Sequence, residues 1–560
     1  MGKLFAQKKS SPYESVEDRE LQMNKRFLHP RVIGVATVIS FLTVFLFGPE
    51  TAQAIPNPTS GPSTGGTVVT IAGLTFTQVE SGNSHSIGLT NDGHVFAWGQ
   101  NFYGQLGNGL NTDSTTPVQV LGIGGGQPLS GVTSIAANGD DSFAIVNGEI
   151  LAWGRDNYGQ LGDGTNNNSS TPVKTKGLSG AGYLQGVTQV SAARDYVLAL
   201  AAGNVYAWGR NLSGQLGNGT LITTNVPVQV SGIGGSGVLS SVTQIAAGEG
   251  TGLALIGGQV AAWGANTNGE LGNANSPNRS TVPVQVLAPG QTIGGSPLTG
   301  VTAIGASPSS YAIAGGHVLA WGYNTFGELC DGTTTHRNVP VEMLGIGGVG
   351  LLTGVTSIKP KAYNFAALAN GQLVTCGSNV YGQLGDGTTN QSTFPVVVLA
   401  PGEVAGGTPL ANVTDFNSGT SARAIVNGAI LGWGWNGSGG LGNGTYDDSI
   451  VPVLGPNFQP ARVVFGSNIG ASLTASGNVW SVVSPAGVAG VTNLSAVANV
   501  FGGTLPGVPS SVSWDAGTFT YEIVLANTGT SNPVPLIVGS SIAVLLGVGL
   551  LIALRRQKRK

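Results

Sequence analysis

The sequence predicts an all-β protein, a seven-bladed β-propeller with four-stranded blades, and three observations carry this prediction. Only 9% of the 560 residues are charged and 92 are glycine, a balance that disfavours a helix-rich enzyme and lacks the Gly-X-Y period of collagen. A Trp-Gly pair returns at nearly constant intervals along the chain. Apolar segments of strand length, separated by turn dipeptides, fill each interval. Eight blades, with residues 68–71 as an extra strand, is the alternative.

The repeat is marked by its Trp-Gly pairs. They begin at Trp98, Trp153, Trp208, Trp263, Trp321 and Trp433, and Cys376-Gly377 stands in the same register. Successive positions are 55, 55, 55, 58, 55 and 57 residues apart. A period of this length, built from strand-sized pieces, is typical of a propeller or a solenoid.

One unit contains about four short antiparallel strands. Asn147-Gly148, Asn370-Gly371 and Asn427-Gly428 are two-residue hairpin turns, because both central positions of such a turn need positive φ. A sheet this small cannot bury both of its faces alone. Stacking the sheets face to face around an axis buries them, and closing the ring protects the edges, with the repeated tryptophan as a wedge between blades.

These features resemble the regulator-of-chromosome-condensation repeat, over about residues 76–480. The resemblance rests on the hairpin with Trp-Gly, followed by Gly-Gln-Leu-Gly-x-Gly, as in 159–164. It implies a seven-bladed propeller. The Gly-x-x-His of the family survives once, at Gly82 to His85, and the first half of the unit occurs eight times, ending in a degenerate copy at 476–480, against seven copies of the second half.

The N-terminal region, residues 1–54, has the order of a secretory signal peptide with a signal helix. Lys25, Arg26 and Arg31 precede the apolar run 32–47, and Ala52 and Ala54 flank the expected cleavage site. An uncleaved anchor is the alternative, and Met23 is a second candidate start. Residues 55–75 are expected to be a flexible lead.

The C-terminal region, residues 525–560, resembles a sortase sorting signal. Leu525, Ala526, Asn527, Thr528 and Gly529 form an LAxTG-type motif, followed by an apolar transmembrane helix at 536–554 and a basic tail. The resemblance implies cleavage between Thr528 and Gly529, attachment to peptidoglycan and a location at the cell wall of a Gram-positive cell. A single-pass membrane protein with the propeller outside is the alternative. Residues 481–524 are expected to form a stalk.

The two cysteines both interrupt the repeat. Cys330 stands where the other copies have glycine, and Cys376 replaces the repeated tryptophan of the next unit. Since the chain is expected to be exported, we predict a disulfide between neighbouring blades, which closes a loop of about 46 residues and stabilises the fold by roughly 4 kcal/mol. Two unrelated buried thiols is the alternative.

The charges and motifs argue for binding rather than catalysis. Residues 55–528 contain 11 Lys or Arg against 21 Asp or Glu, which leaves no positive footprint for nucleic acid. The histidines are not at metal-ligand spacing, and no catalytic or phosphate-binding motif occurs. We therefore expect no enzyme activity, no catalytic residues, no metal and no cofactor.

The positions that vary between repeats suggest a recognition rim. In the turn after each Trp-Gly, the residue before glycine is aromatic at Tyr103, Tyr158, Phe326 and Tyr381. These side chains are expected either to bind a partner on one rim or to pack locally against their loops.

The function expected from these observations is that of a cell-surface, cell-wall-anchored interaction module, an adhesin or a binding protein for an extracellular protein or glycan. The alternatives are a secreted-type inhibitor of an extracellular enzyme such as a β-lactamase, a role that the resemblance implies, and an extracellular lyase or glycosidase. The nuclear member of the family is an exchange factor for a small GTPase, which an exported chain is not expected to meet. Before sorting, the C-terminal helix is expected to hold the chain in the membrane, and sortase and peptidoglycan are the expected partners.

Overall fold

The computed structural model describes residues 75–456 continuously and eight strands outside that range. The predicted signal peptide with Ala52 and Ala54, the sorting motif 525–529 and the membrane helix 536–554 lie outside the described residues. Within the described part, the model contains no helix long and apolar enough to cross a membrane.

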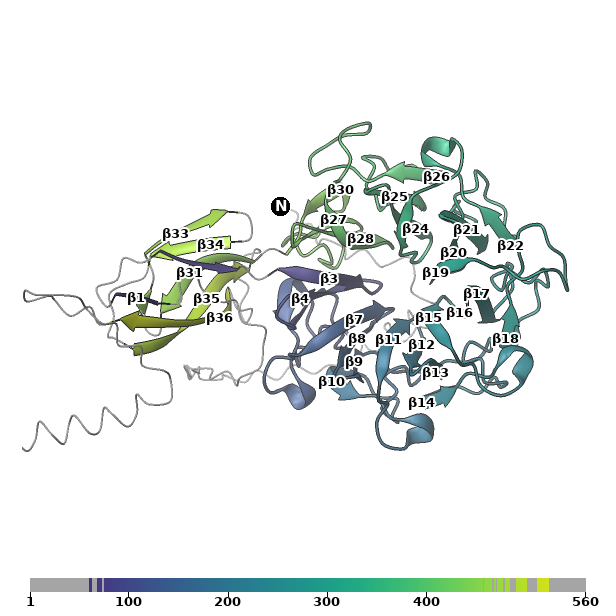
Figure 1. Ribbon diagram of the computed structural model, residues 1–560, viewed down its shortest axis with the longest axis horizontal. Helices are drawn as coiled ribbons and strands as arrows, with labels where there is room; N and C mark the ends of the chain where they lie inside the picture. Colours follow the sequence, from purple (N-terminus) through teal and green to yellow (C-terminus); the bar gives the residue numbers. More distant parts are fainter. Residues whose placement is uncertain are drawn as a thin grey trace, which may run out of the picture.

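Seven four-stranded antiparallel sheets form a wheel (Figure 1). Each blade uses four consecutive strands, numbered outward from the centre. The strands are β3 Phe76–Ser81, β4 His85–Thr90, β5 Val95–Gly99 and β6 Ser114–Gln119 in blade 1; β7 Val132–Asn138, β8 Asp141–Val146, β9 Glu149–Gly154 and β10 Ser169–Lys174 in blade 2; β11 Val187–Ala192, β12 Tyr196–Ala201, β13 Asn204–Gly209 and β14 Thr224–Gln229 in blade 3; and β15 Val242–Ala247, β16 Thr251–Ile256, β17 Gln259–Gly264 and β18 Ser280–Gln285 in blade 4.

The remaining three blades repeat this arrangement. They contain β19 Val301–Ala306, β20 Ser309–Ala314, β21 His317–Gly322 and β22 Arg337–Glu342 in blade 5; β23 Val355–Ile358, β24 Asn364–Ala369, β25 Gln372–Gly377 and β26 Ser392–Val397 in blade 6; and β27 Val413–Asn417, β28 Ser421–Val426, β29 Ala429–Gly434 and β30 Ser449–Leu454 in blade 7. Short 3₁₀ helices, η1 Ile123–Gly125, η2 Leu178–Gly180, η3 Ile233–Gly235 and η4 Ile346–Gly348, follow the outermost strand in four blades.

The hairpin turns have the backbone that their sequences require. Asn147 and Gly148 have φ of 51° and 76°, so β8 and β9 meet in a turn with two left-handed residues. Val146 pairs with Glu149 across it. The match between turn type and strand twist fixes the register, and the register sends one set of side chains to each neighbouring blade.

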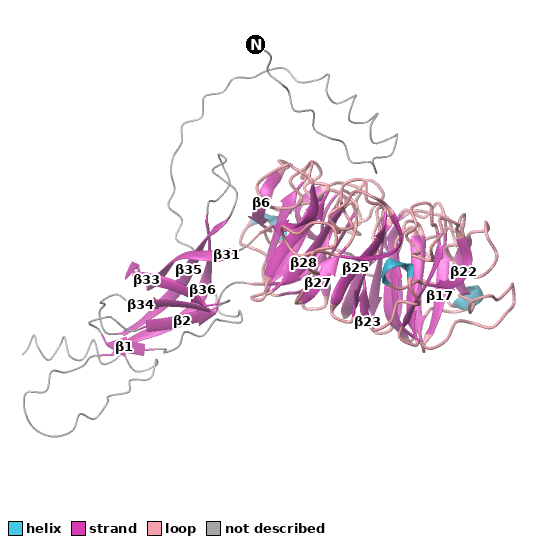
Figure 2. Ribbon diagram, turned by 90° about the horizontal axis from the view of Figure 1, so that it is seen from above, coloured by secondary structure: helices cyan, strands magenta, loops and turns pink. Residues whose placement is uncertain are grey.

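The hydrophobic core lies between adjacent sheets, which stand next to one another in the edge-on view of Figure 2. Between blades 2 and 3, for example, Phe143 and Ile150 pack with Val197 and Trp208, all buried. The indole Nε1 of Trp208 also donates a hydrogen bond of 2.8 Å to the carbonyl oxygen of Gln160 in the preceding blade. The same bond is made by Trp153, Trp263, Trp321 and Trp433, at 2.9–3.0 Å.

The ring closes by this same contact. The indole of Trp98 in blade 1 donates to the carbonyl oxygen of Gly440 in blade 7 at 2.7 Å, and Phe76 N donates to Gly428 O at 2.9 Å. Each blade therefore contacts two neighbours in one way, and the predicted count of seven blades is confirmed.

The eighth, degenerate half-unit lies outside the ring. Its strands β33 Ala471–Ser476 and β34 Val479–Val483 form a three-stranded sheet with β2 Val68–Ala72, in which Val68 pairs with Val483. A second, five-stranded sheet contains β1 Ser60–Pro62, β31 Phe458–Phe465, β32 Asn468–Ile469, β35 Gly490–Val500 and β36 Ser511–Glu522.

The strands outside the ring shift the expected boundaries. The ring ends at Leu454, whereas we predicted a propeller over 76–480. The expected lead 55–75 contains β1 and β2, and the expected stalk 481–524 contains β35 and β36. The physical reason is that a half-unit without its second half cannot complete a four-stranded blade, so its strands pair with segments that the repeat does not include.

The disulfide joins blades 5 and 6 at the place where the repeat is interrupted. Cys330 and Cys376 are bonded, with their Cα atoms 6.1 Å apart. Cys330 has a φ of 53°, in the left-handed region where the other blades have glycine. A Cβ on Gly107, Gly162 or Gly385 would lie 2.7 Å from the indole nitrogen of the next blade. A side chain is therefore tolerated at position 330 because the next blade has no indole there.

The turn after each Trp-Gly is held by a buried amide. In blade 3, Asn211 Oδ1 accepts from Leu216 N at 3.0 Å, and Nδ2 donates to the carbonyl oxygens of Thr220 and Ile222. Blade 2 has Asp156 instead: its Oδ1 accepts from Leu161 N at 2.8 Å, while its Oδ2 is buried without a hydrogen-bond partner among the described residues. Burial raises the pKa of Asp156 to about 8.

The fit between positions 330 and 376 predicts strong coupling. Cys376→Trp alone should destabilise the protein by about 2–4 kcal/mol, because the indole meets the Cys330 side chain. Cys330→Gly together with Cys376→Trp restores the pattern of the other blades and should recover most of that loss, so that the coupling free energy in denaturant unfolding is about 1–3 kcal/mol.

The control for this double-mutant cycle is a count of reactive thiols, made once before and once after reduction. The unfolded parent chain should show no reactive thiol before reduction and two after it. Additive effects of the two substitutions, or two free thiols before reduction, would contradict the arrangement.

Asp156→Asn should stabilise the protein in a pH-dependent way. The carboxyl pKa is raised on folding, so the folded state retains a proton that the unfolded state loses, and stability falls as pH rises from about 4 to 8. An amide does not titrate in this range, so this contribution to stability does not change with pH in the variant. Its NH₂ group can also donate hydrogen bonds to the carbonyl oxygens of the turn. We expect the variant to be more stable than the parent by about 1–3 kcal/mol at pH 8 and nearly equal to it at pH 4.

The converse change is the control for this prediction. Asn211→Asp should introduce the same pH dependence in blade 3. Parallel stability-versus-pH curves for the parent and the Asp156→Asn variant would show that Asp156 is not protonated in the fold.

Candidate functional site

One face of the wheel carries the residues that differ most between blades. The end of each third strand lies beside the start of the second, since Gly154 pairs with Asp141 and Gly209 with Tyr196. The loops between the first and second strands and the turns after Trp-Gly therefore share this face, which we call the loop face. The backbone confirms the proximity: Arg210 N donates to Asp195 O at 2.9 Å.

The four predicted rim aromatics all lie on the loop face, but none is fully exposed. Tyr103, Tyr158, Phe326 and Tyr381 are half-buried. The exposed apolar side chains are one residue earlier in the turns: Phe102, Leu212 and Val380 are 44%, 55% and 66% exposed. The sequence-based rim was thus placed one position away from the side chains that face solvent, although both positions vary between repeats.

Three of the half-buried aromatics, Tyr103, Tyr158 and Phe326, are covered by the neighbouring blade. The Arg155 guanidinium lies 5.5 Å from the centre of the Tyr103 ring, and that of Arg210 lies 5.3 Å from the centre of the Tyr158 ring. Tyr363 of blade 6 covers Phe326 at a centroid distance of 4.9 Å. The two arginine–tyrosine contacts follow the sequence period, because Arg155 and Arg210 both come directly after a Trp-Gly pair and each covers the turn tyrosine of the preceding blade.

These arginines line a pocket of about 280 Å³ on the loop face, which we call the arginine pocket. Its lining includes Arg155, Arg194, Arg210, Asp195, Tyr158 and Glu249.

The charges of the arginine pocket favour an anion. Asp195 lies 3.7 Å from Arg155 and 3.2 Å from Arg210, and Asp140 lies 4.0 Å from Arg155. Burial raises the pKa of Glu249, which favours its neutral form. Three guanidinium groups thus lie beside the carboxyl groups of Asp140, Asp195 and Glu249, of which Glu249 is the one whose ionisation burial disfavours. A guanidinium whose edge is accessible can take a carboxylate in a bidentate geometry, and Arg210 is 39% exposed.

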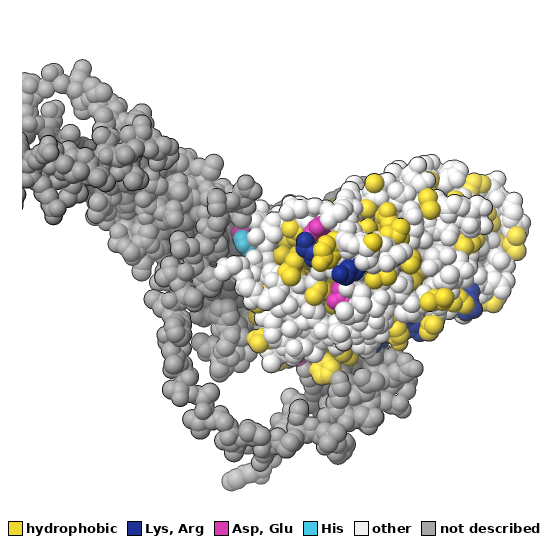
Figure 3. Space-filling view, turned by 90° about the horizontal axis from the view of Figure 1, so that it is seen from below, with side chains coloured by type: hydrophobic (Ala, Val, Ile, Leu, Met, Phe, Trp, Pro, Cys, Tyr) yellow, Lys and Arg dark blue, Asp and Glu magenta, His cyan; other side chains and the backbone are white. Residues whose placement is uncertain are grey.

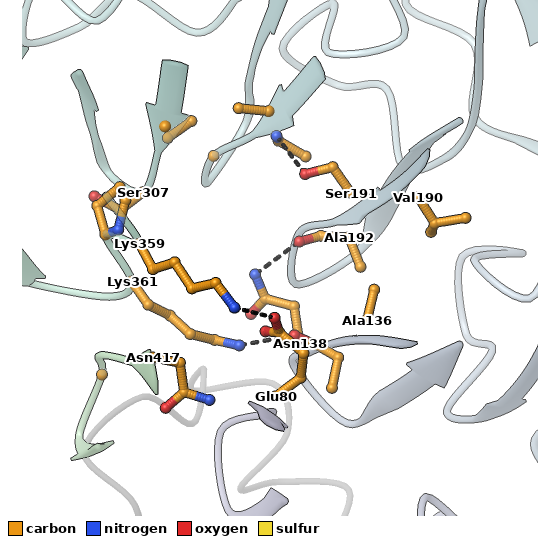
Figure 4. A pocket seen from close by; sticks show the side chains of 18 of the residues that line it. Glu80, Ala136, Asn138, Val190, Ser191, Ala192, Ser307, Lys359, Lys361 and Asn417 are labelled. Carbon is orange, nitrogen blue, oxygen red and sulfur yellow. Dashed lines mark hydrogen bonds and ion pairs between the residues drawn. The ribbon is translucent and has the colours of Figure 1, made fainter. Parts of the chain in front are cut away.

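The centre of the wheel contains a second cavity of about 350 Å³, lined by the inner strands of all seven blades. Three of its charged residues, Glu80, Lys359 and Lys361, lie near one another (Figure 4), and Glu249 of blade 4 also lines the cavity. Lys359 Nζ lies 2.7 Å from Asp415 Oδ1 and 3.1 Å from Glu80 Oε1, so one lysine joins blades 6, 7 and 1. These carboxylates raise the pKa of Lys359.

The outer edge of the wheel is apolar in a repeated way. Figure 3 shows hydrophobic side chains gathered in patches on this edge, with few charged ones among them. Its exposed residues include the first residue of each 3₁₀ helix, namely Ile123, Leu178, Ile233 and Ile346. Each helix packs on the outermost strand of the next blade. Because the feature recurs with the fold, it does not single out a site.

A buried serine–histidine pair links blades 1 and 2. His85 Nε2 lies 2.8 Å from Ser142 Oγ, and this hydroxyl donates to the carbonyl oxygen of Gln105 at 3.0 Å. Burial lowers the pKa of His85 to about 3, so the ring is neutral. Both side chains are buried, which separates them from any substrate. In the described part of the chain, no three His, Cys, Asp or Glu side chains are placed to hold a metal ion.

The repeats match a known family model. The regulator of chromosome condensation (RCC1) repeat matches residues 92–145, 147–200 and 202–255, and a second model of the same repeat matches residues 76–105. Each matched repeat begins in one blade and ends in the next, since residue 92 precedes β5 and residue 145 lies in β8. The sequence unit is therefore offset from the structural blade.

Curated relatives share the same repeats. The chain is 27% identical over 420 residues to the ultraviolet-B receptor UVR8 of Arabidopsis thaliana, covering 73% of this chain and 88% of the receptor. It is 32% identical over 218 residues to the probable E3 ubiquitin-protein ligase HERC4 of Homo sapiens. That match covers 38% of this chain and only 20% of the ligase, so nothing of the ligase activity follows for this protein.

Solved structures show the same fold. Yeast RCC1 (Prp20) bound to Kap60 is similar with a TM-score of 0.52 and 17% identity, over 82% of this chain and 96% of that one. Prp20p of Saccharomyces cerevisiae, described for its binding to Gsp1p and histones, has a TM-score of 0.50 and 20% identity, over 71% and 92% of the two chains.

These neighbours correct the prediction about partners. Sortase and peptidoglycan were expected, together with an extracellular protein or glycan, and a small GTPase was excluded. The two similar propellers are instead described as bound to Kap60 and as binding Gsp1p and histones, and neither description names sortase or peptidoglycan. The expectation failed because it was drawn from terminal segments outside the described residues.

The repeat matches and the seven-bladed wheel agree with each other. Trp98, Trp153 and Trp208 of the matched residues occupy the same place in blades 1 to 3, and the later blades repeat it as far as Leu454. The protein therefore contains an RCC1-type repeat β-propeller.

Proposed function

We propose that this propeller is a non-catalytic protein-binding module that takes an acidic segment of a partner protein at the arginine pocket. The observation that carries the proposal is the gathering of Arg155, Arg194 and Arg210 at one pocket of an otherwise acidic chain. A guanidinium group recognises carboxylates through paired N–H donors.

Three of the other cations of the propeller are paired with carboxylates elsewhere, which makes this gathering informative. Residues 55–528 contain 11 Lys or Arg against 21 Asp or Glu. Lys174 pairs with Glu149 at 2.6 Å and Arg337 with Asp331 at 2.6 Å, both within their own blades. Lys359 is neutralised inside the central cavity. Three of eleven cations at one opening is thus a local excess that folding alone does not require.

The surroundings of the pocket suit a protein partner. Phe102 and Leu212 are exposed in the turns next to Tyr103 and Ser213, so apolar side chains accompany the charged ones. Arginine and aromatic residues are enriched among the residues that dominate protein interfaces. The partners named for the similar propellers, Kap60, Gsp1p and histones, are also proteins.

We also propose that the protein works outside the cytoplasm. The bonded pair Cys330 and Cys376 supports this location, because disulfides persist in oxidising compartments. The apolar run 32–47 followed by Ala52 and Ala54 supports it independently as the pattern of an export signal.

The binding proposal predicts a charge-dependent affinity for acidic peptides. A fluorescein-labelled peptide of glutamate residues with one tyrosine should bind the full chain, and the anisotropy change should weaken as salt screens the charges. Arg210→Ala should reduce the affinity about tenfold, since a hydrogen bond to a charged group contributes about 1.5–3 kcal/mol.

Lys176→Ala supplies a matched control. Lys176 also lies over a tyrosine ring, at 5.2 Å from the centre of Tyr183, but it follows β10 at the outer edge. Its removal should leave the affinity unchanged. Equal losses in the two variants, or equal binding of a lysine peptide, would show that the arginine pocket is not the site.

A further inference from the structure

The wall of the central cavity differs between blades at one repeated position. Seven residues hold the same place, the fifth from the start of each inner strand: Glu80, Ala136, Ser191, Ala246, Gly305, Lys359 and Asn417. Charged or amide side chains occupy this position in blades 6, 7 and 1, and small ones occupy it in blades 2 to 5. The cavity thus has a functionalised side facing a smooth one.

Lys361 adds a second cation to the functionalised side. Its chain passes Gly419, whose Cβ position would lie 3.7 Å from it, and Nζ donates to the carbonyl oxygens of Ser81 and Ala137, the latter at 2.7 Å. An ammonium group has three N–H donors, so one remains. Lys359 is paired with two carboxylates, whereas Lys361 forms no ion pair with a described residue. Burial lowers the pKa of Lys361 to about 8, although the Glu80 carboxylate favours the charged form, and an anion in the cavity would favour that form further.

Asn417 supplies an unmet donor and acceptor on the same side. Its side chain is 3% exposed and lines the cavity, yet neither Oδ1 nor Nδ2 has a hydrogen-bond partner among the described residues. Asn138 lines the same cavity and shows the usual arrangement: Nδ2 donates to Ala192 O at 2.9 Å, and Oδ1 accepts from Gly139 N at 2.8 Å. Buried amides are normally satisfied, so the exception at Asn417 points to a ligand.

We propose that the cavity binds a small 2-hydroxycarboxylate between Lys361 and Asn417. The carboxylate accepts from Lys361 Nζ and Asn417 Nδ2, and the neighbouring hydroxyl donates to Asn417 Oδ1. An amide presents a donor and an acceptor side by side, and a 2-hydroxy acid presents the complementary pair. Figure 4 shows both side chains on the same side of the cavity.

The size of the cavity and the charges around it determine which anions can bind. A cavity of about 350 Å³ is at the small end of ligand sites, and Ala246 and Gly305 on the opposite side leave room for a short apolar tail. Glu80 and Asp415 lie close to Lys359, so a dianion such as phosphate meets more repulsion than a monoanion. The inference is independent of the arginine pocket.

Calorimetric titration of the full chain with L-lactate and glycolate tests the proposal. Both should bind saturably, with acetate about tenfold weaker because it leaves Asn417 Oδ1 unmet, and inorganic phosphate weaker than lactate. Asn417→Ala should lower the affinity for lactate at least about tenfold while leaving Tm unchanged, because no hydrogen bond within the protein is lost. Lys361→Met should abolish binding. If the methionine variant does not fold, the Lys361→Gln variant is tested in its place.

Asn138→Ala separates binding from structure. It removes an amide from the same cavity whose groups are already engaged, so it should lower Tm and leave lactate affinity unchanged. The proposal is overturned if lactate shows no saturable binding up to about 20 mM, well above the millimolar Kd expected of so small a ligand. It is also overturned if phosphate binds more tightly than lactate, or if Asn417→Ala leaves the affinity intact.

Discussion

The fit of one indole against the turn of the preceding blade is the constraint on which the wheel depends. Each indole both fills the space between two sheets and donates to a backbone carbonyl, as Trp208 does to Gln160. The glycine beside it, Gly162, leaves no room for a side chain, since a Cβ there would be 2.7 Å from the indole nitrogen. Because the contact points from every blade to the one before it, the last blade must accept the indole of the first, and the ring closes.

Two junctions differ from the others: one lacks the indole, and the other keeps the indole of Trp98 but has a different residue at its acceptor. Between blades 5 and 6, a disulfide takes the space of the indole, and the change at position 376 is matched by a change at position 330. At the closure, Gly440 stands where other blades have glutamine or glutamate, and the buried Arg423 donates to its carbonyl oxygen and to Ser86 Oγ. Both junctions keep a buried contact to the same backbone carbonyl region, so the wheel tolerates a new residue only with a new partner.

The sequence period was sufficient to predict the strands, the turns and the number of blades, because each of these depends on residues within one unit. It could not predict contacts between units that break the period. Lys361 reaches Ala137 O across 224 residues. The cysteine pair could be predicted from the sequence because both residues interrupt the repeat. The arginine pocket could not be predicted in this way, because the varying positions were compared within one turn and not across the loop face.

The residues that hold the fold and the residues that vary between repeats occupy different positions. This explains how one fold carries two polar sites. The turns of the loop face are held by buried amides such as Asn211 and Asn379, whose hydrogen bonds go to backbone atoms. The neighbouring side chains are therefore free to change without altering the path of the chain. The residue at the fifth position of the inner strands also changes from blade to blade, whereas the third position repeats an inter-blade bond, as Gln78 makes with the backbone of Ile135. Residues that the wheel does not need are thus the ones that place arginine at the rim and an unsatisfied amide at the centre.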